Sequence, residues 1–197
     1  MKKMIVLLLT LLSFSSLALA QSEVKLDPAA RKQLNTYFSN FSEAYVESFQ
    51  QGAVSDEALL AFAKRHNYIN NFKLLKRSPD GQHVLLPSAM VDRSTERYFG
   101  RKIAKHAQAA YPILLADGEA YVFSQVDRLT DIGNGQYRAE GSIYSTGSGE
   151  TLDPHGTPDQ WKKAGAEVER LFRFTALIQK AKTGQGRYIL LEYQVMK

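Results

Sequence analysis

Apolar side chains recur at helical spacing in the first part of the chain. Asp27 and Pro28 mark a helix start, because aspartate is a good N-cap acceptor and proline suits the first helical position. Gly52 is a suitable end for the same helix. One apolar stripe, within an arc of about 80°, contains Leu34, Phe38, Phe41, Tyr45 and Phe49. The pattern predicts a long helix packed on a core, and it leaves open whether the hydroxyls of Tyr37 and Tyr45 reach a pocket or a buried partner.

A second helix and a hairpin follow. Ser55 is an N-cap residue, with Asp56 and Glu57 in the first helical turn. The apolar face of this helix comprises Leu59, Phe62, Ala63, His66 and Ile69. Two short runs, 72–77 and 82–87, flank a turn that contains proline and glycine, and they predict a hairpin.

A short third helix is expected over 88–99, ending at Gly100, whereas 101–118 shows no clear pattern. The rest of the chain alternates like four long strands, over 119–129, 136–146, 170–181 and 187–197. The longest irregular segment, 147–161, lies between the two strand pairs. Helices first and antiparallel hairpins afterwards predict an α+β domain, with helices on one face of a curved sheet.

This order of elements is similar to that of the cystatin-like cone, the fold shared by nuclear-transport-factor-like and ketosteroid-isomerase-like domains. Short phrases also resemble uncharacterised secreted bacterial proteins of that architecture, namely YFSNF (37–41), HNYINN (66–71), YFG (98–100) and RYILLEYQ (187–194). None of these phrases is a catalytic signature. The resemblance implies N-terminal helices packed on a strongly curved antiparallel sheet. It also implies a pocket at the open end of the cone, which holds a substrate, a ligand or a partner, or is filled by side chains.

The start of the chain has the form of an export signal. Lys2 and Lys3 precede an apolar stretch that is too short to span a bilayer comfortably, and an A-x-A cleavage site ends at Ala20. We therefore expect 1–20 to be a signal peptide and 21–197 to form one exported domain, periplasmic or extracellular. An uncleaved membrane anchor is the alternative, and no stable membrane span is expected after cleavage.

Charge and cysteine content exclude some classes of function. Removing Lys2 and Lys3 from the 25 basic residues leaves 23 against 20 acidic residues, a net charge of +3. This bias is too weak to indicate nucleic acid binding. The densest basic cluster, which is interpreted as solvated helix surface, comprises Arg97, Arg101, Lys102 and Lys105. The chain has no cysteine, so neither disulfides nor thiol chemistry contribute.

No arrangement of residues in the sequence indicates catalysis or a metal. The four histidines are far apart and lack metal-ligand spacing, and there is no G-x-S-x-G motif. His66 is expected to be a hydrogen-bonded histidine in the core. His155 lies near Asp153 and Asp159 in a loop rich in proline and glycine, where an ordinary rigid turn is favoured over a cation site. No metal or cofactor is predicted.

Four residues are candidates for binding. Trp161, the only tryptophan, closes the 147–161 loop, and Tyr144 precedes it; both residue types favour contacts with partners. The alternative is that Trp161 anchors the loop to the core. His155 belongs to the same loop. Asp127 shares strand parity with apolar neighbours and is a candidate acid or base in the pocket, whereas the alternative places it in water beside the turn.

We therefore expect an exported domain that binds a small ligand or a protein partner without catalysis, through the cone mouth or the 147–161 loop. The candidate binding residues are Trp161, Tyr144, His155 and Asp127. One alternative is a cone-type enzyme, an isomerase or hydrolase that uses Asp127 or a pocket tyrosine as acid or base. Another is a structural or inhibitory envelope protein that acts through its sheet surface. Nucleic acid is not expected as a partner.

Overall fold

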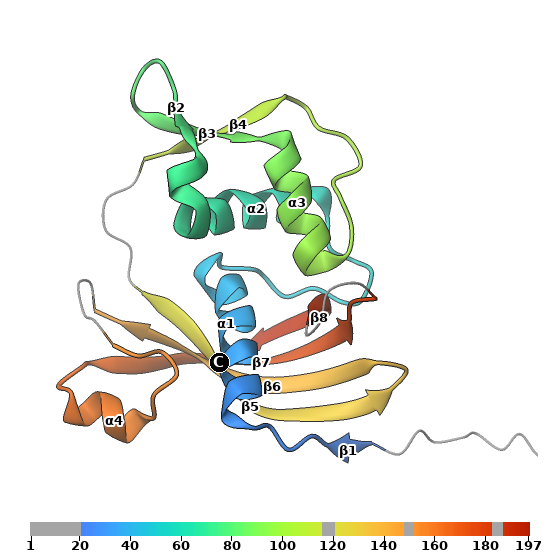
Figure 1. Cartoon of the computed structure of the whole chain (residues 1–197), viewed down its shortest axis with the longest axis vertical. Coiled ribbons are helices and arrows are strands. Elements are labelled where there is room, and N and C mark those ends of the chain that lie inside the picture. Colours follow the sequence, from blue (N-terminus) through green and yellow to red (C-terminus); the bar gives the residue numbers. More distant parts are fainter. Residues whose placement is uncertain (1–20, 116–120, 148–151, 183–186) are drawn as a thin grey trace, which may run out of the picture.

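The computed structural model describes residues 21–115, 121–147, 152–182 and 187–197, so the predicted signal peptide lies outside the described residues. The described part contains four α-helices and two antiparallel sheets (Figure 1). The α+β class predicted from the sequence is therefore confirmed. None of the helices in these ranges is both long enough and apolar enough to cross a membrane.

The elements follow one another in the order that Figure 1 labels. The helices are α1 (Pro28–Glu43), α2 (Asp56–Asn71), α3 (Ser88–Phe99) and α4 (Pro158–Lys163), with a 3₁₀ turn, η1 (Phe72–Leu74), after α2. The five-stranded sheet has the order β1 (Ser22–Glu23), β5 (Val122–Gly133), β6 (Gln136–Thr146), β7 (Val168–Lys180) and β8 (Tyr188–Met196). The three-stranded sheet has the order β2 (Lys76–Arg77), β3 (His83–Pro87) and β4 (Ala110–Leu114).

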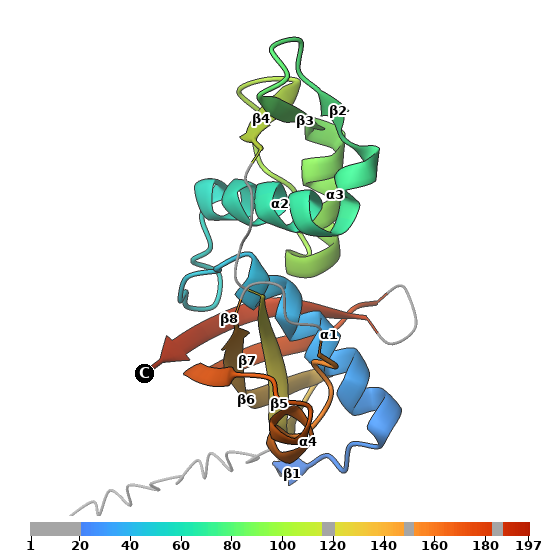
Figure 2. The same cartoon turned by 90° about the vertical axis from the view of Figure 1, so that its left-hand side faces the viewer.

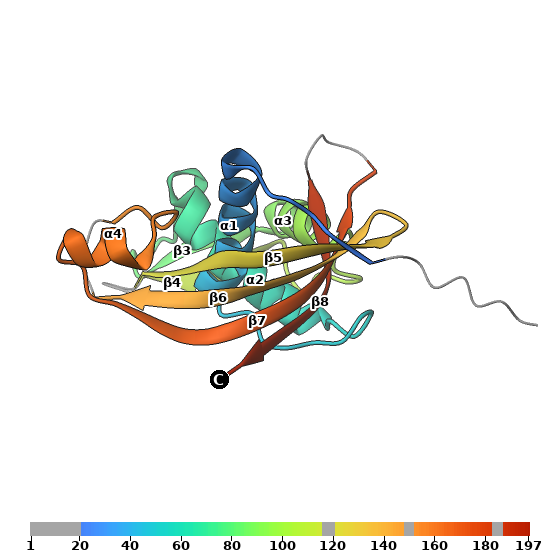
Figure 3. The same cartoon turned by 90° about the horizontal axis from the view of Figure 1, so that it is seen from below.

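The two sheets lie in different parts of the molecule. α1 packs on the five-stranded sheet, whereas α2, α3 and the three-stranded sheet lie together at the other end (Figures 1 and 2). The sequence predicted all N-terminal helices on one strongly curved sheet. Instead, β3 pairs with β2 and β4, while β5 to β8 lie side by side in a separate, open sheet (Figure 3). The cone is therefore not confirmed, although an antiparallel sheet covered by α1 is present.

α1 begins as predicted but ends early. Asp27 accepts a hydrogen bond from the Ala30 amide at 2.7 Å and so caps the first turn. The helix stops at Glu43, because Tyr45 adopts a left-handed backbone conformation with φ of 51°. The predicted continuation of the helix to Gly52 is therefore wrong.

The chain after α1 returns to the five-stranded sheet. The backbone of Phe49 forms two hydrogen bonds with that of Tyr193 in β8, at 2.8 and 3.1 Å. Phe49 thus packs against the core from an extended segment rather than from the helix. Tyr45, which the helical phase placed in the centre of the stripe, is 50% exposed.

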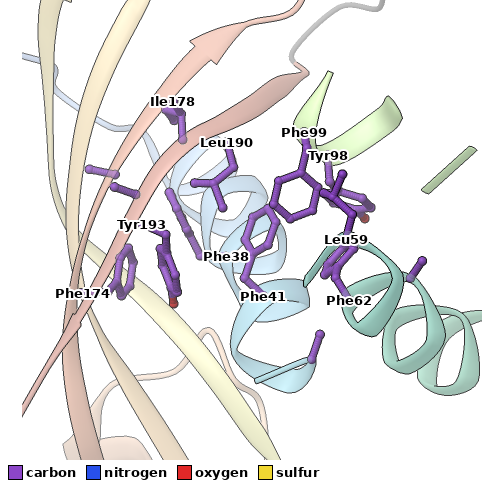
Figure 4. Packing of buried hydrophobic residues seen from close by; sticks show 14 of the residues in the cluster. Phe38, Phe41, Leu59, Phe62, Tyr98, Phe99, Phe174, Ile178, Leu190 and Tyr193 are labelled. Carbon is purple, nitrogen blue, oxygen red and sulfur yellow. The ribbon is translucent and has the colours of Figure 1, made fainter. Parts of the chain in front are cut away.

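One aromatic core joins the two parts of the molecule (Figure 4). Phe38 of α1 packs on Phe174 of β7, with ring centroids 4.7 Å apart. Phe41 of α1 packs on Phe62 of α2 at 5.6 Å and contacts Tyr193 of β8 at 6.2 Å. All five rings are buried. The predicted core role of the α1 stripe is thus confirmed for Phe38 and Phe41.

Buried polar side chains of α1 bind the backbone of β5. The Asn35 side-chain oxygen accepts a hydrogen bond from the Val126 N–H at 2.8 Å. The Ser39 hydroxyl accepts one from the Ser124 N–H at 3.0 Å. β1 pairs with β5 only further along, at Thr130 and Asp131. The two α1 side chains therefore satisfy backbone groups that β1 does not reach, which accounts for their burial.

The other local predictions are mostly confirmed. Ser55 caps α2 by accepting from the Ala58 amide at 3.2 Å, and Gly100 ends α3 in a left-handed conformation. The hairpin within 72–87 is present, with a first strand of only 2 residues. Ile69 is 41% exposed, so its predicted place on a buried face is wrong.

Candidate functional site

A groove runs between the exposed flank of α1, the facing sides of α2 and α3, and the start of β8. It consists of two adjoining cavities of about 310 and 410 Å³, which share two residues of α1 and two of α3. We name it the arginine groove, because its lining includes Arg93 and Arg97 of α3 and Arg187 just before β8. Cavities of this size accommodate small molecules.

The arginine groove is positively charged. Arg93 and Arg97 are one helical turn apart, so both project from the same side of α3. Among the described residues, neither they nor Arg187 form an ion pair, and no acidic side chain lines either cavity. The Arg97 guanidinium lies 5.3 Å from the centre of the Tyr98 ring, a cation–π contact that holds it against the wall. Unpaired guanidinium groups in a concave surface favour carboxylate or phosphate.

Tyr37 of α1 contributes a buried hydroxyl to this groove. The hydroxyl has no hydrogen-bond partner within the described part of the chain. Its ring lies 6.0 Å from that of Tyr98 and 6.2 Å from that of Tyr188. Burial, reinforced by Tyr98, raises the pKa of Tyr37 well above its usual value, so the hydroxyl remains a neutral donor. The structure thus places Tyr37 in the lining of a groove and gives its hydroxyl no buried partner among the described residues.

Amide side chains of α2 form another wall of the groove and hold one another in place. Asn67 donates to the Ala63 carbonyl and to the Ser94 hydroxyl of α3, each at 2.8 Å. Asn71 donates to the Asn67 side-chain oxygen at 3.1 Å. Because these bonds link α2 to α3, the wall is organised before a ligand arrives, and this lowers the entropic cost of binding.

His66 lies in the same wall and is buried, as predicted. Its ring stacks on Phe62 with centroids 5.3 Å apart, and its Nδ1 is 3.3 Å from the side-chain nitrogen of Asn70. Burial, reinforced by Arg97, lowers the pKa of His66 to about 4. The imidazole is therefore neutral at neutral pH and serves as a hydrogen-bonding group rather than as a cation.

Glu43, the last residue of α1, places an acid beside this wall. Its side chain interacts with the Asn70 amide, which also contacts His66. Burial raises the pKa of Glu43 to about 7, although the hydrogen bond with Asn70 acts in the opposite direction. A carboxyl that titrates near neutral pH is able to act as a general acid or base.

The 147–161 loop is organised by Trp161, although 148–151 lies outside the described residues. Trp161 belongs to α4 and is 4% exposed, and its indole N–H donates to a loop carbonyl at 2.8 Å. The ring packs edge-to-face on Phe123 of β5 at 5.3 Å and on Tyr144 of β6 at 5.2 Å. The structure thus brings Trp161 and Tyr144 together in a loop anchor, which is the alternative that the sequence allowed.

His155 and Asp127 lie apart from the arginine groove. The His155 amide donates to the Asp153 carboxylate at 3.0 Å, and burial lowers the pKa of its imidazole although Asp153 opposes this. Asp127 is exposed at a β-bulge between Val126 and Arg128. Its exposure agrees with the alternative that placed it in water, but it lies within β5 rather than beside the turn, and its carboxylate accepts a hydrogen bond from the Ser142 hydroxyl at 3.3 Å. Within the described ranges, no group of three or more acidic or histidine side chains is placed to hold a metal ion.

Apart from Tyr37 and His66, the residues of the arginine groove were not singled out by sequence reasoning. Arg97 was interpreted as solvated helix surface, and the Asn residues of α2 entered only through a resemblance. A signal was present in the spacing, since Arg93 and Arg97, like Asn67 and Asn71, lie four residues apart and share a helix face. Only the packing of α2 against α3 shows that these two faces meet.

No protein-family model, no curated protein and no solved structure matches this chain. The function is therefore inferred from the geometry and the chemistry of the residues.

Proposed function

We propose that this protein is an exported binding domain that holds a small, anionic, hydroxyl-rich molecule in the arginine groove without reacting with it. The observation that carries the proposal is the group of Arg93, Arg97 and Arg187 around cavities whose described lining contains no acid. Export is supported by the basic and apolar start of the chain and the A-x-A site that ends at Ala20.

The lining of the groove indicates the chemistry of the ligand. Guanidinium groups bind carboxylate or phosphate through paired hydrogen bonds. Asn40, Thr36 and the Tyr37 hydroxyl offer donors and acceptors to the hydroxyl groups of a ligand. Tyr188 and Met90 add apolar contact between these polar groups. An acidic sugar or a sugar phosphate meets all three requirements.

Kinship with the cystatin-like cone is part of the same proposal. It is supported by the packing of α1 on an antiparallel sheet and by cavities on the flanks of this helix. A fold of this kind does not choose a function. The charge and hydrogen-bonding groups of the groove carry the argument for a ligand.

Calorimetric titration of the purified protein with glucuronate, glucose 6-phosphate and glucose tests this function. We expect at least one of the two anions to bind roughly tenfold or more tightly than glucose, because a charge-assisted hydrogen bond contributes about 1.5–3 kcal/mol. Binding should weaken at about 0.5 M salt, since exposed charges are screened. Equal affinity for all three sugars would contradict the proposal.

A matched pair of variants locates the binding. Arg97→Gln removes a guanidinium from the groove, and Arg77→Gln removes one from β2, away from it. Both variants lose the same charge. We expect only Arg97→Gln to weaken binding of the anion, and an equal effect of both variants would assign the binding to net charge.

A second candidate function is acid–base catalysis by Glu43, which lies beside the wall of the groove and contacts Asn70. Its pKa, raised by burial to about 7, would suit proton transfer beside the ligand. Incubating glucose 6-phosphate with the protein in D₂O separates the two functions, because an isomerase exchanges the C2 proton for deuterium. The binding proposal expects the C2 proton signal to persist, and loss of this signal in the native protein but not in Glu43→Gln would establish catalysis.

A further inference from the structure

A separate cavity of about 200 Å³ lies at the C-terminal end of α1, between the end of that helix and the core face of the five-stranded sheet. We name it the apolar pocket. Its apolar walls are Val46, Val122, Ile143, Leu171, Phe172 and Val195. It shares no lining residue with the arginine groove.

An irregularity in β7 helps to build the walls. Ile143 of β6 pairs with Phe172, whereas the next residue, Tyr144, pairs with Arg170, so Leu171 is an extra residue in β7. In a regular strand, neighbouring side chains point to opposite faces. At this bulge, both Leu171 and Phe172 line the pocket.

Tyr193 of β8 is one of the lining residues and carries an unpartnered, buried hydroxyl. The side chain is fully buried, and its hydroxyl has no hydrogen-bond partner within the described part of the chain. Figure 4 shows the ring beside Phe174, with the oxygen directed away from Leu190. Burial raises the pKa of Tyr193, so the hydroxyl is protonated and is available as a neutral donor. A buried donor without a partner indicates a missing acceptor.

Tyr45 lies at the rim of the pocket in an unusual backbone conformation. Its φ of 51° places it in the left-handed position after a helix, where glycine is favoured and a bulky residue is strained. The Tyr45 side chain lines the pocket, and the Arg65 guanidinium of α2 lies 4.6 Å from the centre of its ring. Backbone strain of this kind clusters at ligand sites, where a particular side chain is needed despite its cost.

We propose that the apolar pocket is a second binding site, for a neutral and mainly apolar molecule that carries one hydrogen-bond acceptor oxygen. The oxygen accepts a hydrogen bond from Tyr193, and the apolar body contacts the walls. Glu47, an exposed residue, also lines the pocket, and its carboxylate disfavours an anionic ligand such as a fatty acid, an effect that the Arg65 guanidinium beside Tyr45 opposes. An engineered apolar cavity of about 150 Å³ holds benzene, so this pocket has room for an aromatic ring with a short substituent.

Three probes of similar size separate the parts of this proposal: acetophenone, ethylbenzene and benzoate. Acetophenone has both the apolar ring and an acceptor oxygen, ethylbenzene lacks the oxygen, and benzoate is an anion. Their dissociation constants are measured from amide chemical-shift changes in NMR titrations of the purified protein. We expect acetophenone to bind about fivefold more tightly than ethylbenzene, the effect of one neutral hydrogen bond, and benzoate to bind least tightly.

Tyr193→Phe removes the hydroxyl and retains the ring. We expect this variant to bind acetophenone and ethylbenzene with equal affinity, with the loss confined to acetophenone. Tyr37→Phe is the matched control, since it removes a buried unpartnered hydroxyl from the arginine groove, and it should leave both affinities unchanged. Leu171→Trp, which fills the pocket, should abolish the shifts caused by both probes.

Three results would overturn the proposal. The first is an unchanged preference for acetophenone in Tyr193→Phe. The second is a set of shifts that map outside the apolar pocket. The third is the absence of binding of either neutral probe to the native protein up to their solubility, which would mean that the Tyr193 hydroxyl contacts only water.

Discussion

The arginine groove and the apolar pocket lie along the same helix, and each contains a buried tyrosine hydroxyl without a hydrogen-bond partner in the described part of the chain. Tyr37 lines a cavity with two guanidinium groups and two side-chain amides, whereas Tyr193 lines one whose walls are mainly aliphatic and aromatic, with Ser42 and Glu47 as polar members. A buried tyrosine hydroxyl is thus part of both proposals, although the proposed ligands differ in charge. In both proposals the surrounding charge, rather than the buried donor itself, distinguishes an anion in the groove from a neutral molecule in the pocket.

The substitution with the largest expected effect, at Phe41, should disrupt both sites at once. Phe41 is fully buried and contacts Phe62 and Tyr193, so it links the parts of the core that support the groove and the pocket. Phe41→Ala should lower the free energy of unfolding by about 3–5 kcal/mol, because it deletes a buried ring and leaves a cavity. Urea denaturation measures this change. A loss below about 1 kcal/mol would show that α1 does not join the two parts as described.

Charge reversal in the groove should separate the two sites. Arg97→Glu removes a donor to the anion and adds repulsion, so we expect the affinity for the anionic probe to fall by a factor of roughly 10–100. The affinity of the apolar pocket for acetophenone should not change. Calorimetry and NMR titration measure the two affinities, with Arg77→Glu as the control for net charge. Parallel losses at both sites would indicate that the sites are coupled.

The pH dependence of stability tests the pKa shifts of two groups at the groove, Glu43 and His66. Burial raises the pKa of Glu43 from 4.5 to about 7 and lowers the pKa of His66 from 6.5 to about 4. Between pH 4.5 and 6.5 the folded protein therefore holds a proton on Glu43 that the unfolded chain has released, and lacks a proton on His66 that the unfolded chain carries. The Glu43 contribution makes stability fall as pH rises, and the His66 contribution makes it rise.

Substituting one of these two groups should leave the contribution of the other to the pH dependence of stability. Relative to the native protein, Glu43→Gln should gain stability as pH rises through this window, and His66→Gln should lose stability. Each difference is on the order of 1–2 kcal/mol, below the full value of the shifts because Glu43 is partly exposed and the window covers only part of each titration. Urea denaturation at several pH values between 4.5 and 7 measures these slopes. Variants with pH profiles parallel to that of the native protein would contradict the assigned shifts.

The smallest effects come from the two hydroxyls in the absence of ligands. Tyr37→Phe and Tyr193→Phe should each leave stability unchanged or raise it by up to about 1 kcal/mol, because an unsatisfied buried hydroxyl is removed. Thermal and urea denaturation measure the change. A loss of more than about 1 kcal/mol in one variant would reveal an internal partner for that hydroxyl and weaken the case for a ligand there.

Local signals in the sequence predicted the starts of helices and the hairpins. Asp27 and Ser55 cap helices through bonds that span three residues, and the turn at 133–136 joins β5 to β6, so these features need no distant contact. α4 was not predicted, although Thr157 and Gln160 form a capping box, because this short helix lies in a loop rich in proline and glycine.

Features set by distant contacts were not predictable in the same way. α1 ends at a left-handed tyrosine, Tyr45, rather than at a glycine. Phe49 fits the helical spacing of the apolar stripe, so nothing in the sequence indicated that it pairs with β8. The strands divide into two sheets because β3 pairs with β4. The groove likewise forms only where α1, α2, α3 and β8 come together. The sequence of no single one of these segments predicts that contact. Trp161 was a candidate binding residue because it is the only tryptophan in the chain. Its burial, however, follows from packing on Phe123.

The hydrogen bonds from Asn35 and Ser39 to β5 also bear on how this protein behaves at high concentration. An uncovered strand edge is a template for pairing with other chains, and so for aggregation. Along Ser124 to Val126 this edge is occupied by helix side chains, and on β8 the backbone of Tyr193 is occupied by Phe49. The packing that creates cavities on the flanks of α1 thus also protects the five-stranded sheet from edge-to-edge association.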